Sequence, residues 1–158
     1  MKKLQAEIKQ TRPFTSLEEE VSLNIARTSA VLDHYMIDVL RGHGLTPTQY
    51  NVLRILRGAA DRGLCRNDVR DRLISMVPDT TRLLDRMADM GLVLRVRETD
   101  DRRFVTTRIT SKGLSILAEL DAPVLNAHRQ QYQHMSEAEL RLLVGLLEKV
   151  RERGELPQ

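Results

Sequence analysis

The feature that most constrains this chain is a change of apolar period near its middle. From Pro78 to Met90 the apolar side chains recur every three or four residues, which is typical of an amphipathic helix, and Gly91 follows as a helix stop. Residues 92–97 instead alternate with a period of two, as strands do, and residues 104–110 repeat that pattern after a short turn. The sequence therefore predicts a helix that is followed at once by a β-hairpin.

Helical patterns fill most of the remaining chain. A long helix is expected from Ser16, an N-cap residue, to about Gly42, and a short helix over residues 66–73 directly precedes the one at Pro78. Residues 58–64 are expected to form a loop. Further helices are expected from Thr46 to about Gly58, from Thr110 to beyond Leu125, and from Ser136, which has capping-box spacing to Glu139. The predicted fold is mainly α with a small β-hairpin wing, of the α+β class.

Length and composition bound the class of protein. The chain has 158 residues, 41% of them apolar and 30% charged, which is enough for one core and too apolar for a disordered protein. Its longest uncharged apolar run, residues 142–147, is far below the roughly 20 residues that a membrane helix needs. Residues 1–13 lack the apolar stretch of a secretory signal. We therefore expect a soluble, cytoplasmic, single-domain protein (residues 1–158) without a membrane partner.

The positively charged residues of the chain are mostly arginines rather than lysines. It carries 20 arginines and 5 lysines within a net charge of only +3. The planar guanidinium group grips phosphate or guanine in two places at once, whereas lysine is a point charge. Codon bias explains an excess of arginine as well as nucleic-acid binding does. The positions of the arginines in the fold have to distinguish these two explanations.

Two consecutive helices joined by a short turn, the second followed by a basic hairpin, describe a winged helix-turn-helix. In that arrangement the second helix lies in the DNA major groove. At about 100° per residue, the apolar residues of the helix from Pro78 share one face, and Arg82 and Arg86 project together from the other. The arginine-bearing face therefore predicts contact with DNA bases.

A solvated polar face is the competing interpretation of this helix. Asp79, Asp85 and Asp89 favour it, because carboxylates on a groove-facing surface repel phosphate. The helix dipole accounts for an aspartate at the helix start, and we expect Asp85 to pair with a neighbouring arginine. The alternative function is a winged-helix protein-interaction module that does not bind DNA.

The predicted hairpin is also rich in arginine. Its strands and tip carry Arg95, Arg97, Arg102, Arg103 and Arg108. A narrow protrusion tipped with guanidinium groups suits the minor groove, whose negative potential attracts them. Asp101 is placed to hold Arg103 by a short-range ion pair and to aim it outward. A solvated turn over residues 100–103 explains the same tip without DNA.

These segments together resemble the multiple-antibiotic-resistance regulator (MarR) family of bacterial transcription factors. The matching stretches are LTPTQYNVL (45–53), TRLLDRM (81–87), GLVLR (91–95), DRR (101–103) and ITSKG (109–113), in the family's order and spacing. The resemblance implies a homodimer that binds a pseudo-palindromic operator in double-stranded DNA. It also implies dimerisation helices in residues 1–44 and 111–158 around a winged helix-turn-helix lobe in residues 45–110.

The resemblance further implies which residues meet the DNA. They lie on the reading helix and on the wing, and are Pro78, Thr81, Arg82, Arg86, Arg102 and Arg103. Asp101 is expected to orient the wing. Two features depart from the family's pattern and concern the base contacts rather than the fold. The turn at residues 74–77 lacks the usual glycine, and proline and aspartate occupy the helix start, where small hydroxyl residues are common.

The terminal helices carry more apolar surface than a winged lobe of this size can cover. A homodimer interface is expected to cover Leu17, Val21, Leu140, Leu143, Leu147 and Val150. Two-fold symmetry then places two reading helices about one DNA turn, roughly 34 Å, apart. Packing of the two chain ends on each other within one chain is the alternative.

The same resemblance implies a small, often aromatic and anionic effector that binds where the dimerisation helices meet the winged lobe. It also implies a repressor, which leaves its DNA when the effector binds. The candidate polar groups are Arg27, His34, Tyr35 and Tyr50. We expect no cofactor, metal or enzymatic activity. The single cysteine, Cys65, excludes a cysteine-based zinc site, and no nucleophile and base occur at useful spacing.

Overall fold

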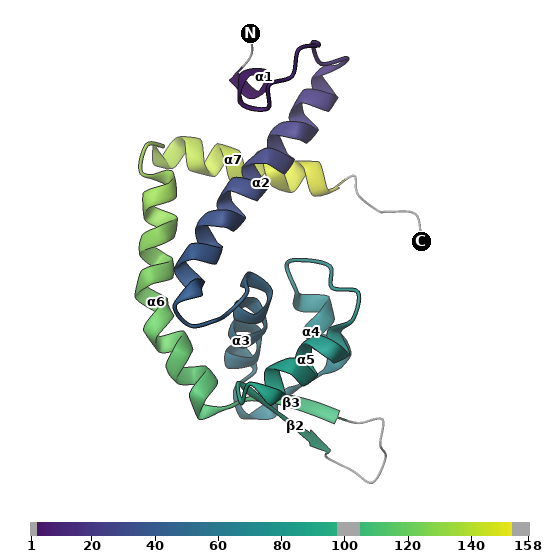
Figure 1. Ribbon diagram of the computed structural model, residues 1–158, viewed down its shortest axis with the longest axis vertical. Coiled ribbons are helices and arrows are strands. Elements are labelled where there is room, and N and C mark those ends of the chain that lie inside the picture. The colour runs from purple at the N-terminus through teal and green to yellow at the C-terminus, as the bar shows by residue number, and fades with distance from the viewer. Residues whose placement is uncertain (1–2, 98–104, 153–158) are drawn as a thin grey trace.

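The computed structural model describes residues 3–97 and 105–152 (Figure 1). Its elements in chain order are α1 (Lys3–Glu7), α2 (Leu17–Arg41), α3 (Pro47–Ala59), the 3-10 helix η1 (Ala60–Arg62), β1 (Leu64–Cys65), α4 (Arg66–Arg72), α5 (Thr80–Asp89), β2 (Val93–Arg97), β3 (Val105–Ile109), α6 (Ser111–Tyr132) and α7 (Glu137–Glu152). None of the helices in these ranges is both long enough and apolar enough to cross a membrane.

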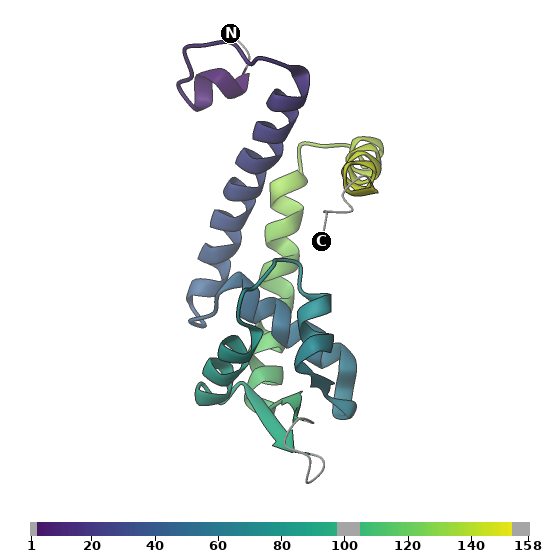
Figure 2. The same cartoon turned by 90° about the vertical axis from the view of Figure 1, so that its right-hand side faces the viewer.

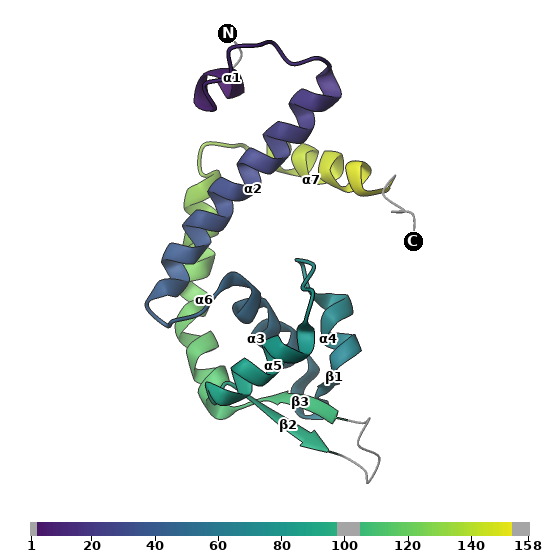
Figure 3. The same cartoon turned by 45° about the vertical axis from the view of Figure 1, so that its right-hand side comes forward.

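The elements form a lobe and a pair of long helices that extend from it. The helices α3, α4 and α5 pack with the small sheet, and α2 and α6 run side by side away from this lobe (Figures 1 and 3). At the far end of α6, α7 turns aside, and Figure 2 shows it clear of both α2 and the lobe. The mainly α fold with a small β wing is therefore confirmed.

Side-chain caps set the starts of three helices where the sequence predicts them. The Thr46 hydroxyl accepts a hydrogen bond from the Gln49 N–H at 3.2 Å, and the Gln49 side chain accepts from the Thr46 N–H at 2.9 Å, which is a capping box at α3. Ser136 and Glu139 make the same exchange at α7, and Ser16 caps α2.

The helix α5 begins two residues later than predicted. Its first residue is Thr80 rather than Pro78, because the Asp79 carboxylate accepts a hydrogen bond from the Arg82 N–H at 2.9 Å and so occupies the N-cap. Pro78 thus lies in the preceding turn. The predicted stop is confirmed, since Gly91 has a φ of 71° just beyond the C-cap.

The predicted loop over residues 58–64 is wrong at both ends. Its first two residues belong to α3, and its last residue opens the strand β1, which pairs antiparallel with β3 through Leu64 opposite Thr107. The sheet order is β1-β3-β2, with the hairpin register running from Val93 opposite Ile109 to Arg97 opposite Val105. A strand of two residues is too short to display an alternating pattern, so only pairing with β3 reveals it.

The core lies where the three lobe helices meet the base of α6. Its fully buried apolar side chains are Leu40 of α2, Val52, Leu53 and Leu56 of α3, Val69 of α4, Leu84 and Met87 of α5, Leu92 before β2, and Leu117 and Leu120 of α6. Each lobe helix is therefore held by its apolar face and turns its polar face outward.

Gly113, in the first turn of α6, tests how tightly this helix packs on the hairpin. A Cβ atom there would lie 2.6 Å from the Leu92 carbonyl oxygen and 2.8 Å from Cγ1 of Ile109. We expect Gly113→Ala to lower the free energy of unfolding by about 1–3 kcal/mol in urea titrations, the usual cost of overpacking. The control is Gly58→Ala, where a Cβ meets nothing within 4 Å and stability should be unchanged or slightly higher. Equal stabilities of the two variants would contradict this packing.

Candidate nucleic-acid interface and ligand pocket

The two faces of α5 differ as the helical period predicts. Leu84 and Met87 are fully buried, whereas Arg82 and Arg86 are exposed one turn apart. Thr81 is partly buried, and its hydroxyl accepts a hydrogen bond of 3.4 Å from an arginine at the start of α4. The free face of α5 therefore presents two guanidinium groups to solvent.

The carboxylate on this helix has the arginine partner that was expected. Asp85 forms an ion pair with Arg95 of β2, which ties α5 to the base of the wing. The side chain of Arg95 is 23% exposed and that of Asp85 is 53% exposed. The pair neutralises a charge that would otherwise repel phosphate, so the competing interpretation based on this aspartate is weakened.

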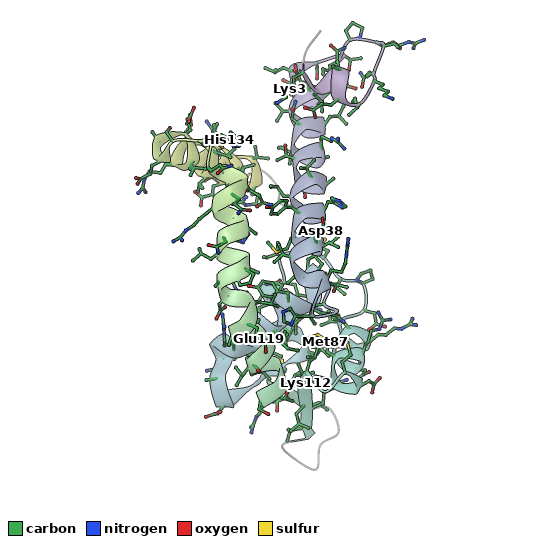
Figure 4. The ribbon with its side chains drawn as sticks, turned by 60° about the vertical axis from the view of Figure 1, so that its left-hand side comes forward. Lys3, Asp38, Met87, Lys112, Glu119 and His134 are labelled. Atoms are coloured by element: carbon green, nitrogen blue, oxygen red, sulfur yellow. The ribbon has the colours of Figure 1, made fainter. Side chains whose placement is uncertain are left out.

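The C-terminal end of α5 is bound to its surroundings. Lys112 of α6 donates a hydrogen bond of 2.8 Å from Nζ to the carbonyl oxygen of Met90, the C-cap residue. Figure 4 shows Lys112 at the base of α6 and Met87 within the lobe beside it. A cation at a helix C-terminus also interacts favourably with the helix dipole. This end of the helix is therefore fixed to α6.

The base of the wing is described, and its tip is not. Asp101, Arg102 and Arg103 lie outside the described residues, so the roles expected for them stay predictions. Arg95 and Arg108 on the strands are partly buried. They support the hairpin at its base.

A pocket of about 230 Å³ lies where α2 and α6 meet the lobe. Four segments line it: α2 through Leu32, Asp33 and Met36; α3 through Pro47, Thr48, Tyr50, Asn51 and Arg54; the turn before α5 through Ile74 and Ser75; and α6 through His128, Gln131 and Tyr132. Such a mixture of apolar walls with a few polar groups is typical of small-molecule sites.

Three polar groups in the pocket suit an acceptor-bearing aromatic molecule. The side-chain Nε2 of Gln131 is buried and has no hydrogen-bond partner within the described part of the chain. The Arg54 guanidinium lies 5.9 Å from the centre of the Tyr50 ring. Burial raises the pKa of the Tyr50 phenol above its ordinary value, so this group is a neutral donor near pH 7.

Apolar side chains are also left uncovered away from the pocket. No side chain of α7 is buried, and Leu142, Val144, Leu146 and Val150 are each more than half exposed. Of the residues expected at a dimer interface, Leu17, Val21 and Val150 are exposed, and Leu140, Leu143 and Leu147 are partly buried. This surface is larger than scattered single exposed residues explain.

Comparison with known proteins identifies the chain. No family model matches it. The crystal structure of a MarR transcription factor from Planctomyces limnophilus is 37% identical, and the match covers 86% of this chain and 98% of that one, with a TM-score of 0.66. The chain belongs to the MarR family of transcription factors. Its function is that of a DNA-binding transcription regulator, and it is not an enzyme.

Two other proteins are similar to this MarR-family chain. The homoprotocatechuate degradative operon repressor of Escherichia coli is 28% identical over 129 residues, which are 82% of this chain and 84% of that protein. An organohalide-sensing transcriptional regulator in its 2,4-dichlorophenol-bound form is 16% identical, with a TM-score of 0.77 and coverage of 92% of this chain and 88% of that one. The second match shows the shared fold.

The structure brings one of the four predicted effector residues of this MarR-family chain to the pocket. Tyr50 lines it. Arg27 instead lies 3.8 Å from a Glu7 carboxylate oxygen, and His34 lies 3.9 Å from Asp38. The Tyr35 hydroxyl donates to Gln130 of α6 at 2.8 Å. These three are absent from the residues that line the pocket.

The sequence reasoning missed most of the polar lining. The omitted polar residues are Asp33, Thr48, Asn51, Arg54, Ser75, His128, Gln131 and Tyr132. Their spacing offers a signal, because Tyr50, Asn51 and Arg54 share one face of α3, and the three from α6 also fall at intervals of one and three. The spacing does not say which faces of α2, α3 and α6 turn toward one another, because tertiary packing decides this.

Two of the helices that line the pocket, α3 and α6, are joined by an ion pair. Arg57 of α3 donates two hydrogen bonds, of 2.8 and 2.9 Å, to the Asp121 carboxylate of α6. These hydrogen bonds lower the pKa of Asp121 below its ordinary value. Because the folded-state pKa is lowered, the pair stabilises the fold above the unfolded-state pKa and loses this effect as the pH falls through the folded-state pKa.

We therefore expect a pH-dependent coupling energy between Arg57 and Asp121. A double-mutant cycle with Arg57→Met and Asp121→Asn, followed by urea denaturation, should give below about 1 kcal/mol at pH 7, since both side chains are more than one third exposed. The coupling should begin to fall as the pH drops below about 3.8, the ordinary pKa of an aspartate, and should be lost once the pH is below the lowered folded-state pKa. A coupling energy that stays constant down to pH 2 would contradict the assignment.

Proposed function

We propose that this MarR-family protein is a homodimeric repressor that binds a pseudo-palindromic operator and releases it when a small aromatic anion occupies the pocket. The observation that carries the proposal is the exposed pair Arg82 and Arg86 on the free face of α5, opposite the buried Leu84 and Met87. In this proposal the protein acts in the cytoplasm, where a bacterial chromosome lies.

The free face of α5 supports base reading in the major groove. An α-helix fits that groove, and a guanidinium group makes two hydrogen bonds to the O6 and N7 atoms of guanine. Arg82 and Arg86 are one turn apart and reach neighbouring base pairs, while Thr81 lies beside them at the helix start. Pro78 in the turn before α5 contacts the backbone in this arrangement, and the wing residues Arg102 and Arg103 enter the minor groove.

The uncovered apolar surface supports the dimer. Leucines and valines on α7 and on the first half of α2 stay exposed in the single chain. Two copies that pack these helices against one another remove them from water, at about 25 cal/mol for each Å² buried. Two-fold symmetry then presents both reading helices to one side of a duplex.

The pocket supports release by an aromatic ligand that bears an acceptor. Its apolar walls suit a ring, the free Gln131 amide suits an oxygen acceptor, and Arg54 suits an anion. The names of similar proteins agree with this ligand class, since one represses a homoprotocatechuate degradative operon and another was crystallised with 2,4-dichlorophenol. A ligand releases DNA only if it binds the DNA-incompetent spacing more tightly.

The DNA-reading role predicts distinct effects of two arginine substitutions. Selection from random DNA followed by gel shifts should yield an operator whose binding weakens steeply with salt. Arg82→Ala should lose about 5- to 100-fold in affinity and relax the base preference at one position of each half-site, whereas Arg103→Ala should weaken binding to all sequences. The control is Arg141→Ala, on α7. A parent protein that ignores DNA yet retains its dimer and a protein partner would instead favour the protein-interaction module.

The dimer predicts a loss of assembly when charge enters the α7 surface. The variant Leu143→Glu/Leu147→Glu places four carboxylates in a two-fold interface, and we expect a monomer by sedimentation at micromolar concentration and no specific operator binding. Glu148→Gln on the same helix is the control and should remain dimeric. A double variant that stays dimeric and binds the operator would place the interface elsewhere.

A further inference from the structure

The two ends of α5 are held very differently. At its C-terminal end, Lys112 binds the Met90 carbonyl at 2.8 Å, and the Leu92 N–H donates to the Met87 carbonyl at 3.0 Å. The N-terminal end follows a turn, residues 74–79, in which Ile74 is 86% exposed and Met76 is 90% exposed. The C-terminal end of α5 is therefore fixed to α6, whereas the turn that leads into its N-terminal end, beside Thr81 and Arg82, is largely exposed.

One hydrogen bond joins this turn to the rest of the lobe. The Ile74 N–H donates to Oδ1 of Asn51 on α3, at 3.0 Å. Within residues 74–78, which all lie in the described range 3–97, this is the only hydrogen bond to another element. Five residues after Ile74, Asp79 caps α5. The start of α5 is thus placed by the Asn51 contact through this turn, together with the 3.4 Å hydrogen bond from Arg66 of α4 to the Thr81 hydroxyl.

Both partners in this hydrogen bond line the pocket. Asn51, Ile74 and Ser75 all belong to its walls. A molecule in the pocket therefore meets the Asn51 carboxamide and the turn directly, and it competes with the Ile74 N–H for the same acceptor or separates the two by its size. Occupancy of the pocket and the placement of the turn are coupled at this point.

We propose that Asn51 is the positioning residue that couples the pocket to the reading helix. With the pocket empty, its carboxamide holds the turn so that Thr81 and Arg82 stand at the DNA face. Occupancy breaks the hydrogen bond, and the start of α5 moves about its anchored end. This role rests on the proposed function, in which a pocket ligand releases DNA.

The test compares two variants of Asn51 with one pocket control. Asn51→Ala removes the acceptor, Asn51→Asp keeps an oxygen in the same place, and Thr48→Ala alters the pocket wall on α3 without touching the hydrogen bond. Full-length protein is measured in three ways: hydrogen exchange at the Ile74 amide, affinity for the selected operator, and the factor by which 2,4-dichlorophenol or benzoate weakens operator binding. Calorimetry reports the affinity of each probe for the protein without DNA.

We expect Asn51→Ala to speed exchange of the Ile74 amide at least 5-fold and to weaken operator binding about 5-fold without any probe, the effect of one lost hydrogen bond. Each probe should still bind this variant but weaken its DNA binding by a smaller factor than in the parent. Asn51→Asp should retain the parent's exchange rate and its operator affinity, and Thr48→Ala should change only the affinity for the probes.

Two results overturn the coupling role while leaving the proposed function intact. One is a parent that responds to a probe and an Asn51→Ala variant that responds by the same factor. The other is an Asn51→Asp variant that matches Asn51→Ala in exchange and operator affinity. A parent that binds no DNA overturns the proposed function, and the coupling role with it.

Discussion

The surface that we propose faces DNA depends on the burial of one face of α5. Leu84 and Met87 are both 0% exposed, and burial of such side chains contributes about 1.5–3 kcal/mol each. Their burial fixes the rotation of the helix about its own axis. Because successive side chains are about 100° apart, that rotation also determines where Arg82 and Arg86 point. The exposed face that we propose reads DNA thus follows from the burial of the apolar face.

The contacts around α5 divide the molecule into a fixed side and an adjustable side. The ion pair from Asp85 to Arg95 joins the helix to the wing, and Lys112 joins its C-terminal end to α6. Elsewhere, a pocket lies between α2, α3, α6 and the turn that precedes α5. A small molecule there acts between the long helices and the lobe without meeting the wing. The proposed switch therefore moves the start of α5, and with it the spacing of the two reading helices, without unfolding them.

Local chemistry explains why much of the fold is readable from sequence. Helix starts at Thr46 and Ser136 depend on hydrogen bonds between residues three apart, so the signal lies within a few residues. The start of α5 was misplaced because Pro78 and Asp79 both favour a helix start, and the carboxylate took the cap. The strand β1 was missed because its evidence is a partner strand more than forty residues away. The pocket lining was largely missed for the same reason, since it combines four segments.

By itself the sequence determined the order of helices and hairpin, the buried and free faces of α5, and a likeness to MarR regulators that a 37% identical structure makes certain. These properties depend on periodicity, caps and short motifs, which are local in the chain. Only the tertiary structure decided that Asp85 pairs with Arg95, that Arg57 pairs with Asp121, and that Asn51 meets the turn before α5. Such contacts join separate elements, so they depend on how the helices pack. If a helix turned about its axis by the angle of one residue, the same side chains would meet different neighbours.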